Sequence, residues 1–427
     1  GAQVRPSTGA GGQGASLSIV AGAPHSIRGE AANGDRCGLY SSTAGDGAGG
    51  SIRVSAPQLT LTEHALITAE STGAGNAGSV ELDVGQLDLD GGAQVRTSTG
   101  AGGQGGSLSI VSGAPLSISG EAANGDRSGL YSSTAGDGAG GSIRVSAPQL
   151  TLASHAFISA ESTGAGDAGT VNLLLDTLNI SSGGQVSTSV FNTGQGGDLT
   201  VQASGAVSIS GEAANGDRSG LYSSTAGEGA GGSIQVRATR LDLGNHALIT
   251  AESSASGNAG NITVSLNERL DMSNASIRTR ALSADGGNIE IMAPDMVYLL
   301  DSDITTSVGT GFGDGGNITI DPEFVILNNS KIVANAFGGD GGNILIVADN
   351  FSASPDSIVD ASSRFGLDGT VVIKSPEADL TSGLTELPES FLNVAALLRE
   401  PCSARRSINQ SSFIVRGRSA IPPGPMS

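Results

Sequence analysis

Residues 119–136 read Ser-Gly-Glu-Ala-Ala-Asn-Gly-Asp-Arg-Ser-Gly-Leu-Tyr-Ser-Ser-Thr-Ala-Gly, and the same stretch occurs almost unchanged at two other places in the chain. The other copies begin at Arg28 and Ser210, so the register between copies is 91 residues. A long internal repeat in a Gly-rich chain is typical of a solenoid, in which each unit packs only on its neighbours. The sequence therefore predicts one elongated body in place of several globular domains.

A shorter unit of about 28 residues recurs inside the long one, as in residues 51–78. Three runs in this unit alternate inward apolar and outward residues, and the inward positions are Ile52 and Val54, then Leu59 and Leu61, then Ala65, Ile67 and Ala69. Pro57, residues 62–64 and the Gly-rich residues 71–78 supply bends between the runs. This pattern predicts an all-β fold, a right-handed parallel β-helix of about 13 coils with three short strands per coil. At about 4.8 Å per coil, the rod would be on the order of 60 Å long.

The domain organisation follows from where the repeat stops. We expect a parallel β-helix over residues 1–374 and a C-terminal capping region with a Pro-rich tail over residues 375–427. In that second region, residues 387–398 have the pattern of a short helix and residues 411–415 that of a strand, which together would cap the open strand edges. Within the β-helix, the 91-residue repeats span 1–91, 92–182 and 183–273, followed by single coils of about 28 residues.

Composition narrows the classes of function. With 67 Gly, no Trp and 3% aromatic residues, the chain suits a thin core. The net charge of −20 argues against a nucleic-acid partner, because phosphate binding needs a basic surface. No apolar run reaches the roughly 20 residues of a membrane span. Cys37 and Cys402 lie many coils apart in sequence, so we expect no disulfide between them.

Two sets of motifs resemble a known family. The turns Gly-Asn-Ile-Thr-Val at 260–264 and Gly-Asn-Ile at 287–289 and 316–318 resemble those of filamentous-haemagglutinin-like exoproteins of two-partner secretion. The C-terminal motifs are similar to the ending of the large cyanobacterial members, with Ser419-Ala420 where two glycines are typical, and they lie at 379–388, 402–404, 412–418 and 421–423. The chain begins at Gly1 within a repeat, so we interpret it as a C-terminal fragment that lacks the family's N-terminal secretion domain.

The resemblance implies a location and a partner. Members of this family are secreted, surface-associated β-helical rods that a partner barrel moves across the outer membrane. We therefore expect this chain outside the cell, or on the outer surface of a Gram-negative-type bacterium.

The lengthened coils carry about seven extra residues around Glu-Ala-Ala-Asn-Gly-Asp-Arg, which should protrude as three loops about 14 Å apart. Tyrosine and arginine are common in sugar and protein contacts. The candidate ligand-binding residues are therefore Tyr40, Tyr131, Tyr222, Arg36, Arg127 and Arg218. In the alternative interpretation, Leu39 and Tyr40 cover the outer face of the coil and the near-identity of the copies records a recent duplication.

The sequence predicts neither a catalytic site nor a bound cofactor. Carboxylates are spread mostly one per turn, whereas catalysis needs acids and bases that converge on one groove. Three histidines at equivalent bends are about 14 Å apart, too far for shared metal coordination, and we expect them to be solvated: His64, His155 and His246. Scattered Ca²⁺ binding stays open as an alternative for Asp46, Asp137 and Glu228. Four asparagines at one coil position predict a side-chain amide ladder: Asn261, Asn288, Asn317 and Asn343.

These features favour a non-enzymatic exported rod that acts in adhesion or in a surface layer, with a host, cell-surface or glycan ligand that the sequence does not identify. Two alternatives stay open. One is a polysaccharide-acting β-helix enzyme, and the other is a passive stalk for a missing N-terminal module.

Overall fold

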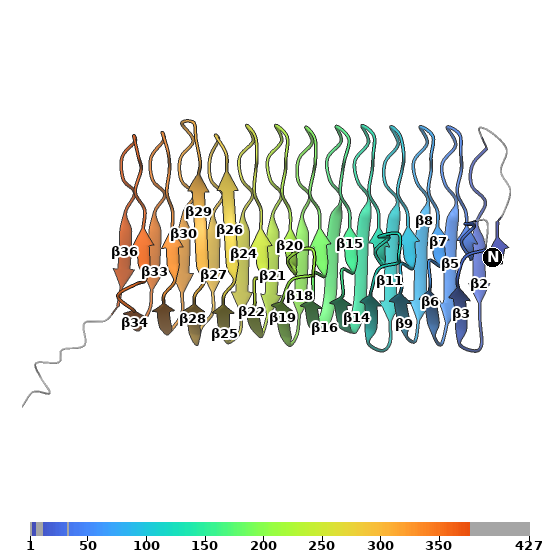
Figure 1. Cartoon of the computed structure of the whole chain (residues 1–427), viewed down its shortest axis with the longest axis horizontal. Helices are drawn as coiled ribbons and strands as arrows, with labels where there is room; N and C mark the ends of the chain where they lie inside the picture. The colour runs from blue at the N-terminus through green and yellow to red at the C-terminus, as the bar shows by residue number, and fades with distance from the viewer. Residues whose placement is uncertain (1, 6–11, 32–33, 376–427) are drawn as a thin grey trace, which may run out of the picture. The chain divides into compact units, whose positions relative to one another are not determined.

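The computed structural model describes residues 2–5, 12–31 and 34–375. These residues form β-strands that pair in parallel and stack as a solenoid of about twelve turns, running from β2 to β36 along one axis (Figure 1). No helix occurs within the described ranges. The predicted all-β parallel β-helix is confirmed. The predicted helix at 387–398 and strand at 411–415 lie outside the described residues.

Each turn has up to three strands. The first strands are β2 (Leu17–Val20), β5 (Ser51–Ala56), β8 (Ser79–Val84), β11 (Ser107–Ser112), β18 (Leu199–Ala203), β21 (Ile234–Ala238), β24 (Ile262–Leu266), β27 (Ile289–Met292), β30 (Ile318–Asp321), β33 (Ile344–Val347) and β36 (Val371–Lys374). The second strands are β3 (His25–Arg28), β6 (Leu59–Thr62), β9 (Leu87–Asp90), β12 (Leu116–Ser119), β19 (Ala206–Ser210), β22 (Arg240–Gly244), β25 (Arg269–Ser273), β28 (Met296–Leu300), β31 (Phe324–Asn328) and β34 (Asn350–Ala353). The third strands are β1 (Gln3–Val4), β4 (Gly38–Tyr40), β7 (Leu66–Thr68), β10 (Gln94–Arg96), β13 (Gly129–Tyr131), β15 (Phe157–Ser159), β17 (Gln185–Ser187), β20 (Gly220–Tyr222), β23 (Leu248–Thr250), β26 (Ser276–Ala281), β29 (Asp303–Val308), β32 (Lys331–Val333) and β35 (Ile358–Asp360).

Two turns depart from the prediction of three short strands. In them the first and second strands merge into β14 (Ser142–Ala153) and β16 (Thr170–Ser181), each 12 residues long. Pro148 is the counterpart of Pro57, which was predicted to bend the chain one repeat earlier. Instead the ladder continues on both sides of Pro148, because its neighbours Ala147 and Gln149 pair with Leu175 and Thr177. The strand therefore continues through this corner.

The alternating pattern places the core where the sequence predicted it. In the turn made by β5, β6 and β7, Ile52 is 1% exposed, and Val54, Leu59, Leu61, Ala65, Ile67 and Ala69 are fully buried. Two buried hydroxyl groups in later turns have backbone partners. Thr188 Oγ1 donates to Gly197 O at 2.8 Å and Thr279 Oγ1 to Gly287 O at 2.6 Å. The core is therefore thin, continuous and closed at its polar corner by hydrogen bonds.

The Gly-Gly-Asn turns stack with little space between coils. A Cβ on Gly316 would lie 1.9 Å from Gly287 O, which explains glycine at this position. The predicted side-chain amide ladder is confirmed next to it for three of the four asparagines, since Asn317 Nδ2 donates to Asn288 Oδ1 at 3.2 Å and Asn343 Nδ2 to Asn317 Oδ1 at 3.1 Å. The backbone N–H of Asn317 donates to Asn288 Oδ1 at 2.9 Å, and that of Asn343 donates to Asn317 Oδ1 at 2.9 Å. Each amide oxygen thus satisfies a backbone donor of the following coil.

The pairing register shows where the extra residues of a lengthened coil go. Val84 pairs with Ser112, 28 residues on; Asp90 pairs with Ser119, 29 residues on; and Gln94 pairs with Gly129, 35 residues on. One extra residue therefore lies at the first corner and six lie between the second and third strands. The strands on both sides keep their inward alternation.

Candidate functional site

Three hairpins lie between the second and third strands of the lengthened coils. We call residues 30–36, 121–127 and 212–218 loops 1, 2 and 3; residues 32–33 of loop 1 are not described. Isolated antiparallel bridges close all three: Glu30 with Arg36, Glu121 with Arg127, and Glu212 with Arg218. The bridges hold the extra residues outside the parallel ladder.

The tip of each described hairpin is an Asn-Gly-Asp turn. In loop 2, Asn124 Nδ2 donates to Asp126 Oδ2 at 2.9 Å, and the Asp126 N–H donates to Asn124 Oδ1 at 3.0 Å. Loop 3 repeats both bonds at 3.0 Å between Asn215 and Asp217. Glycine is required between them, since Gly125 has φ of +85°. The turn therefore presents a carboxylate in a fixed orientation.

Each loop is bound to the next one along the axis. Arg36 of loop 1 forms an ion pair with Asp126 of loop 2, and its Nη1 donates to Gln94 Oε1 at 2.8 Å. Arg127 of loop 2 forms the same ion pair with Asp217 of loop 3, and its Nη1 donates to Gln185 Oε1 at 3.2 Å. Two of the predicted ligand-binding arginines are thus engaged within the chain.

The sequence patterns did not indicate the residues that hold these two arginines, which are Asp126, Asp217, Gln94 and Gln185. A signal was present, because glutamine replaces the apolar residue that other third strands have at this position, such as Leu66 and Phe157. The contact itself could not be predicted, because the arginine and the aspartate are 90 residues apart in the sequence.

The three tyrosines lie at the base of the hairpins and hydrogen-bond to the hairpin backbone. They lie in β4, β13 and β20, and each hydroxyl donates to the carbonyl of the loop arginine four residues earlier, at 2.8 Å for Tyr40, 2.9 Å for Tyr131 and 2.8 Å for Tyr222. Burial raises the pKa of Tyr131 and Tyr222 to about 12. This placement fits the alternative interpretation, in which the tyrosine ring covers the outer face of its coil. Leu39 instead points into the core, with 4% exposure.

The prediction that the histidines are exposed to solvent is wrong for two of the three. His64 and His155 were expected to be solvated, yet their side chains are only 17% and 14% exposed. His155 lies between two loops, with Nδ1 2.8 Å from Glu121 Oε2 and Nε2 3.2 Å from Asn215 Oδ1. His64 lies between loops 1 and 2, with Nδ1 3.6 Å from Glu30 Oε2. The prediction failed because sequence spacing did not show that the loops lean over the next coils.

His246 is the exception, and it is exposed as predicted. It lies in the bend after loop 3, and its Nε2 is 3.3 Å from Asn274 Nδ2. No loop follows loop 3 in the described chain to cover it.

A row of acidic residues lies on the third-strand face beside the loops. Glu70 pairs with Arg96, with Nη1 and Oε1 3.4 Å apart, and Glu252 pairs with Arg278. At the equivalent place in the middle repeat, Glu161 faces Ser187, whose Oγ donates to Glu161 Oε1 at 2.5 Å. Burial raises the pKa of Glu161. A pocket of about 290 Å³ opens where the arginine is missing, and Tyr222 also lines it.

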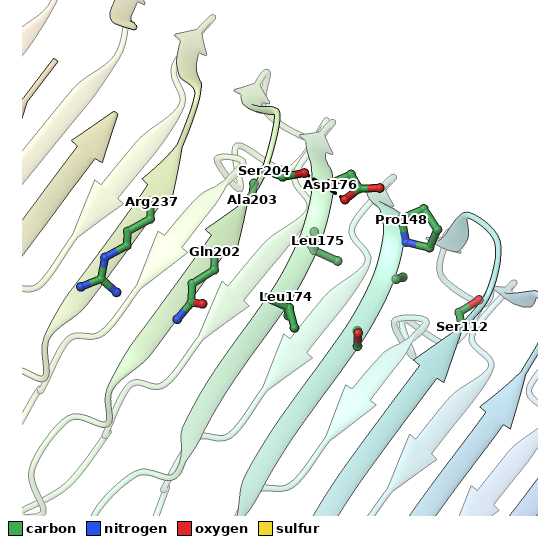
Figure 2. A pocket seen from close by; sticks show the side chains of 11 residues that line it. Ser112, Pro148, Leu174, Leu175, Asp176, Gln202, Ala203, Ser204 and Arg237 are labelled. Atoms are coloured by element: carbon green, nitrogen blue, oxygen red, sulfur yellow. Dashed lines mark hydrogen bonds between the residues drawn. The ribbon is translucent and has the colours of Figure 1, made fainter. Parts of the chain in front are cut away.

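A second pocket, of about 560 Å³, lies at the corner between first and second strands (Figure 2). Leu174, Gln202 and Arg237 project into it from successive coils. Asp176 accepts a hydrogen bond from Ser204 Oγ at 2.9 Å at its rim. Asp176 is the single carboxylate among its lining residues, whereas glycoside hydrolysis normally uses a pair of carboxyl groups. The pocket offers a polar surface for an extended ligand and lacks that pair.

The open question of Ca²⁺ concerned three acidic residues on separate turns. Asp46, Asp137 and Glu228 are all exposed, and each lies three coils from the next. Among the residues that the structure describes, no group of three or more histidine, cysteine or carboxylate side chains is placed to hold a metal ion. Within the same residues, no helix is long and apolar enough to cross a membrane.

Comparisons with known protein families, with curated proteins and with solved structures found no match to this chain.

Proposed function

We propose that this chain is a non-enzymatic, surface-exposed rod that acts in adhesion or in a surface layer, with the row of loops as its contact face. The observation that carries the proposal is that near-identical hairpins lie at 91-residue intervals and are bound to one another by Arg36–Asp126 and Arg127–Asp217. A contact surface that is repeated and rigid suits binding to a repeated target, because several weak contacts act together.

The proposed route to the surface rests on the family resemblance. Export would use two-partner secretion, with a partner barrel in the outer membrane of a Gram-negative-type bacterium. The ligand would be a host, cell-surface or glycan structure. The acidic composition, with a net charge of −20, supports such a partner over a nucleic acid.

Two other functions are separable from this one. A polysaccharide-acting enzyme would turn over glycans. The 560 Å³ pocket offers it Asp176 as its one carboxylate, and a pocket of about 760 Å³ farther along the chain is lined by Asp321, Glu323 and Asp349. A passive stalk would have no ligand of its own, and its surface loops would be dispensable.

The test removes the three loops and keeps every strand of the lengthened coils in its pairing register. In each lengthened coil, the nine residues between the paired strands (29–37, 120–128 and 211–219) are replaced by Glu-His-Ala, the three residues found at 63–65. We expect the variant to keep its β-sheet circular dichroism and to lose binding to intact cells and to a broad glycan array. Equal binding by the folded variant would refute the adhesive role of the loops, and turnover of a glycan would establish the enzyme.

A further inference from the structure

Loop 3 is the last loop of the row, and its arginine differs from the other two. Arg36 and Arg127 each have a carboxylate from the following loop and a glutamine side chain from a later coil. Arg218 is half-buried at the equivalent position, but among the described residues its guanidinium has neither a hydrogen bond nor an ion pair. The backbone carbonyl of Arg218 is bonded like those of the other two loop arginines, because Gln185 Nε2 and the Tyr222 hydroxyl both donate to it.

The register explains why Arg218 lacks these partners. The position of Gln94 and Gln185 is taken by Ser276, which pairs with Leu248 as Gln185 pairs with Phe157. Where a fourth hairpin would supply an aspartate, two residues join β28 to β29 directly. His246 is exposed at the same end of the row, whereas His155 is covered by Asn215 of loop 3. The end of the row thus has the arginine of an occupied loop junction without its acceptors, and a histidine whose Nε2 accepts from Asn274 Nδ2 in place of facing a loop asparagine.

We propose that this end of the row, formed by Arg218 and His246, is a binding site for a carboxylate presented on an Asn-x-Asp peptide turn. The chain contains two examples of the complex, since loop 2 docks in this way on Arg36 and loop 3 on Arg127. The site stands independently of the proposed function, because the junction chemistry is the same whatever surface the rod contacts.

The charges of the neighbouring groups allow an anion to bind here. Asp217, next to Arg218 in sequence, already accepts from Arg127 and from Asn215 Nδ2. The Arg218 guanidinium keeps its donors for an incoming carboxylate, and two parallel N–H donors suit a carboxylate geometrically. The other acidic residue of the same hairpin is Glu212, whose backbone pairs with that of Arg218. A docked turn should bind weakly, on the order of millimolar or weaker, because it makes a single partly exposed ion pair.

The experiment uses the protein's own loop as the probe. A backbone-cyclised peptide with the sequence of residues 211–219, Gly-Glu-Ala-Ala-Asn-Gly-Asp-Arg-Ser, is titrated against the 427-residue chain by saturation-transfer NMR. We expect saturable binding that falls at least about tenfold in Arg218→Ala. The matched control is Arg144→Ala, which removes one exposed positive charge from β14 and should leave binding unchanged.

Other outcomes would overturn the proposal. One is that the cyclic peptide binds wild type and Arg218→Ala equally. The other is that a peptide with asparagine in place of its aspartate binds wild type as tightly as the original peptide does. Glucuronate tests the other source of a carboxylate. If it competed as well as the cyclic peptide at equal concentration, the assignment to a peptide turn would be wrong.

Discussion

Glu161 shows how one changed residue alters a repeated contact. In the first and third repeats the equivalent glutamates, Glu70 and Glu252, face Arg96 and Arg278, while Glu161 faces Ser187. Two serine hydroxyls donate to its carboxylate, at 2.5 Å and 3.0 Å, yet burial outweighs them and raises the pKa of Glu161. The hydroxyl donors therefore compensate only part of the desolvation of this carboxylate.

We predict that Ser187→Arg stabilises the solenoid at neutral pH by about 1 kcal/mol, by restoring the missing ion pair. A carboxyl whose folded-state pKa is raised contributes stability below its ordinary pKa of 4.5 and loses it as the pH rises through the folded value. The gain from the arginine should therefore grow above about pH 4.5 and vanish below it. Urea midpoints measured at pH 4 and pH 7 check this.

Glu161→Gln is the control for this pH dependence. It removes the titrating group, so its stability relative to wild type should also increase with pH over the same range. A loss of stability in Ser187→Arg at both pH values would show that the 290 Å³ pocket does not accept a guanidinium.

Individual core residues could be predicted from the sequence, and individual surface contacts could not. Alternation alone identified Ile52, Val54 and Ile67 as inward-facing, because a strand has only two faces. The exposure of His64 was predicted wrongly, since it depends on a hairpin 34 residues earlier that leans over it. Contacts of this kind depend on loop direction, which sequence spacing does not encode.

At the scale of the element, the hairpins behave as one connected row. An ion pair that is partly shielded from solvent contributes more than an exposed one, because salt and water screen it less. The side chains of Arg127 and Asp217 are 27% and 34% exposed, so their pair is intermediate. The row therefore adds stability between coils that are three apart, beyond the ladder bonds between neighbours.

We predict a coupling energy of about 1 kcal/mol between Arg127 and Asp217 in a double-mutant cycle with Arg127→Ala and Asp217→Ala. The chain provides a matched control in Arg218→Ala, which removes the same side chain from a hairpin that has no loop after it. Its cost should stay within about 0.5 kcal/mol. Guanidinium unfolding midpoints of the five proteins give all these values. A control as costly as Arg127→Ala would show that the arginine acts through its own hairpin alone.

The elements themselves were predictable to different degrees. That the extra residues of the repeat lie outside the ladder followed from the need to keep the register. The closure of a hairpin by the Glu121–Arg127 bridge could not be predicted from the register, and neither could the merging of two strands into β14. Proline usually interrupts a strand, but Pro148 lies at a corner where its neighbours keep the ladder paired.

On the scale of the described solenoid, stability is the sum of coil interfaces, so a change at one coil acts mainly on its neighbours. The row of loops is the one feature here that joins coils at longer range, and it ends at loop 3. Five further third strands follow β20, from β23 to β35, without a hairpin of this kind before them.

We therefore predict that a fourth hairpin can be grafted. Leu300 lies in the same column as Ser210, through Gly244 and Ser273, and Asp303 lies in the column of Gly220, through Leu248 and Ser276. Replacing residues 301–302 with the sequence of residues 211–219 should place a new aspartate beside Arg218 and cover His246. Because this supplies the missing ion pair, we expect a gain of about 1 kcal/mol in unfolding free energy over the same graft with its aspartate changed to alanine. The graft should also abolish binding of the cyclic peptide, since the internal hairpin would occupy the site. A graft that folds but leaves peptide binding intact would place the peptide site elsewhere on the chain, and the role of Arg218 as the open end of the row would be lost.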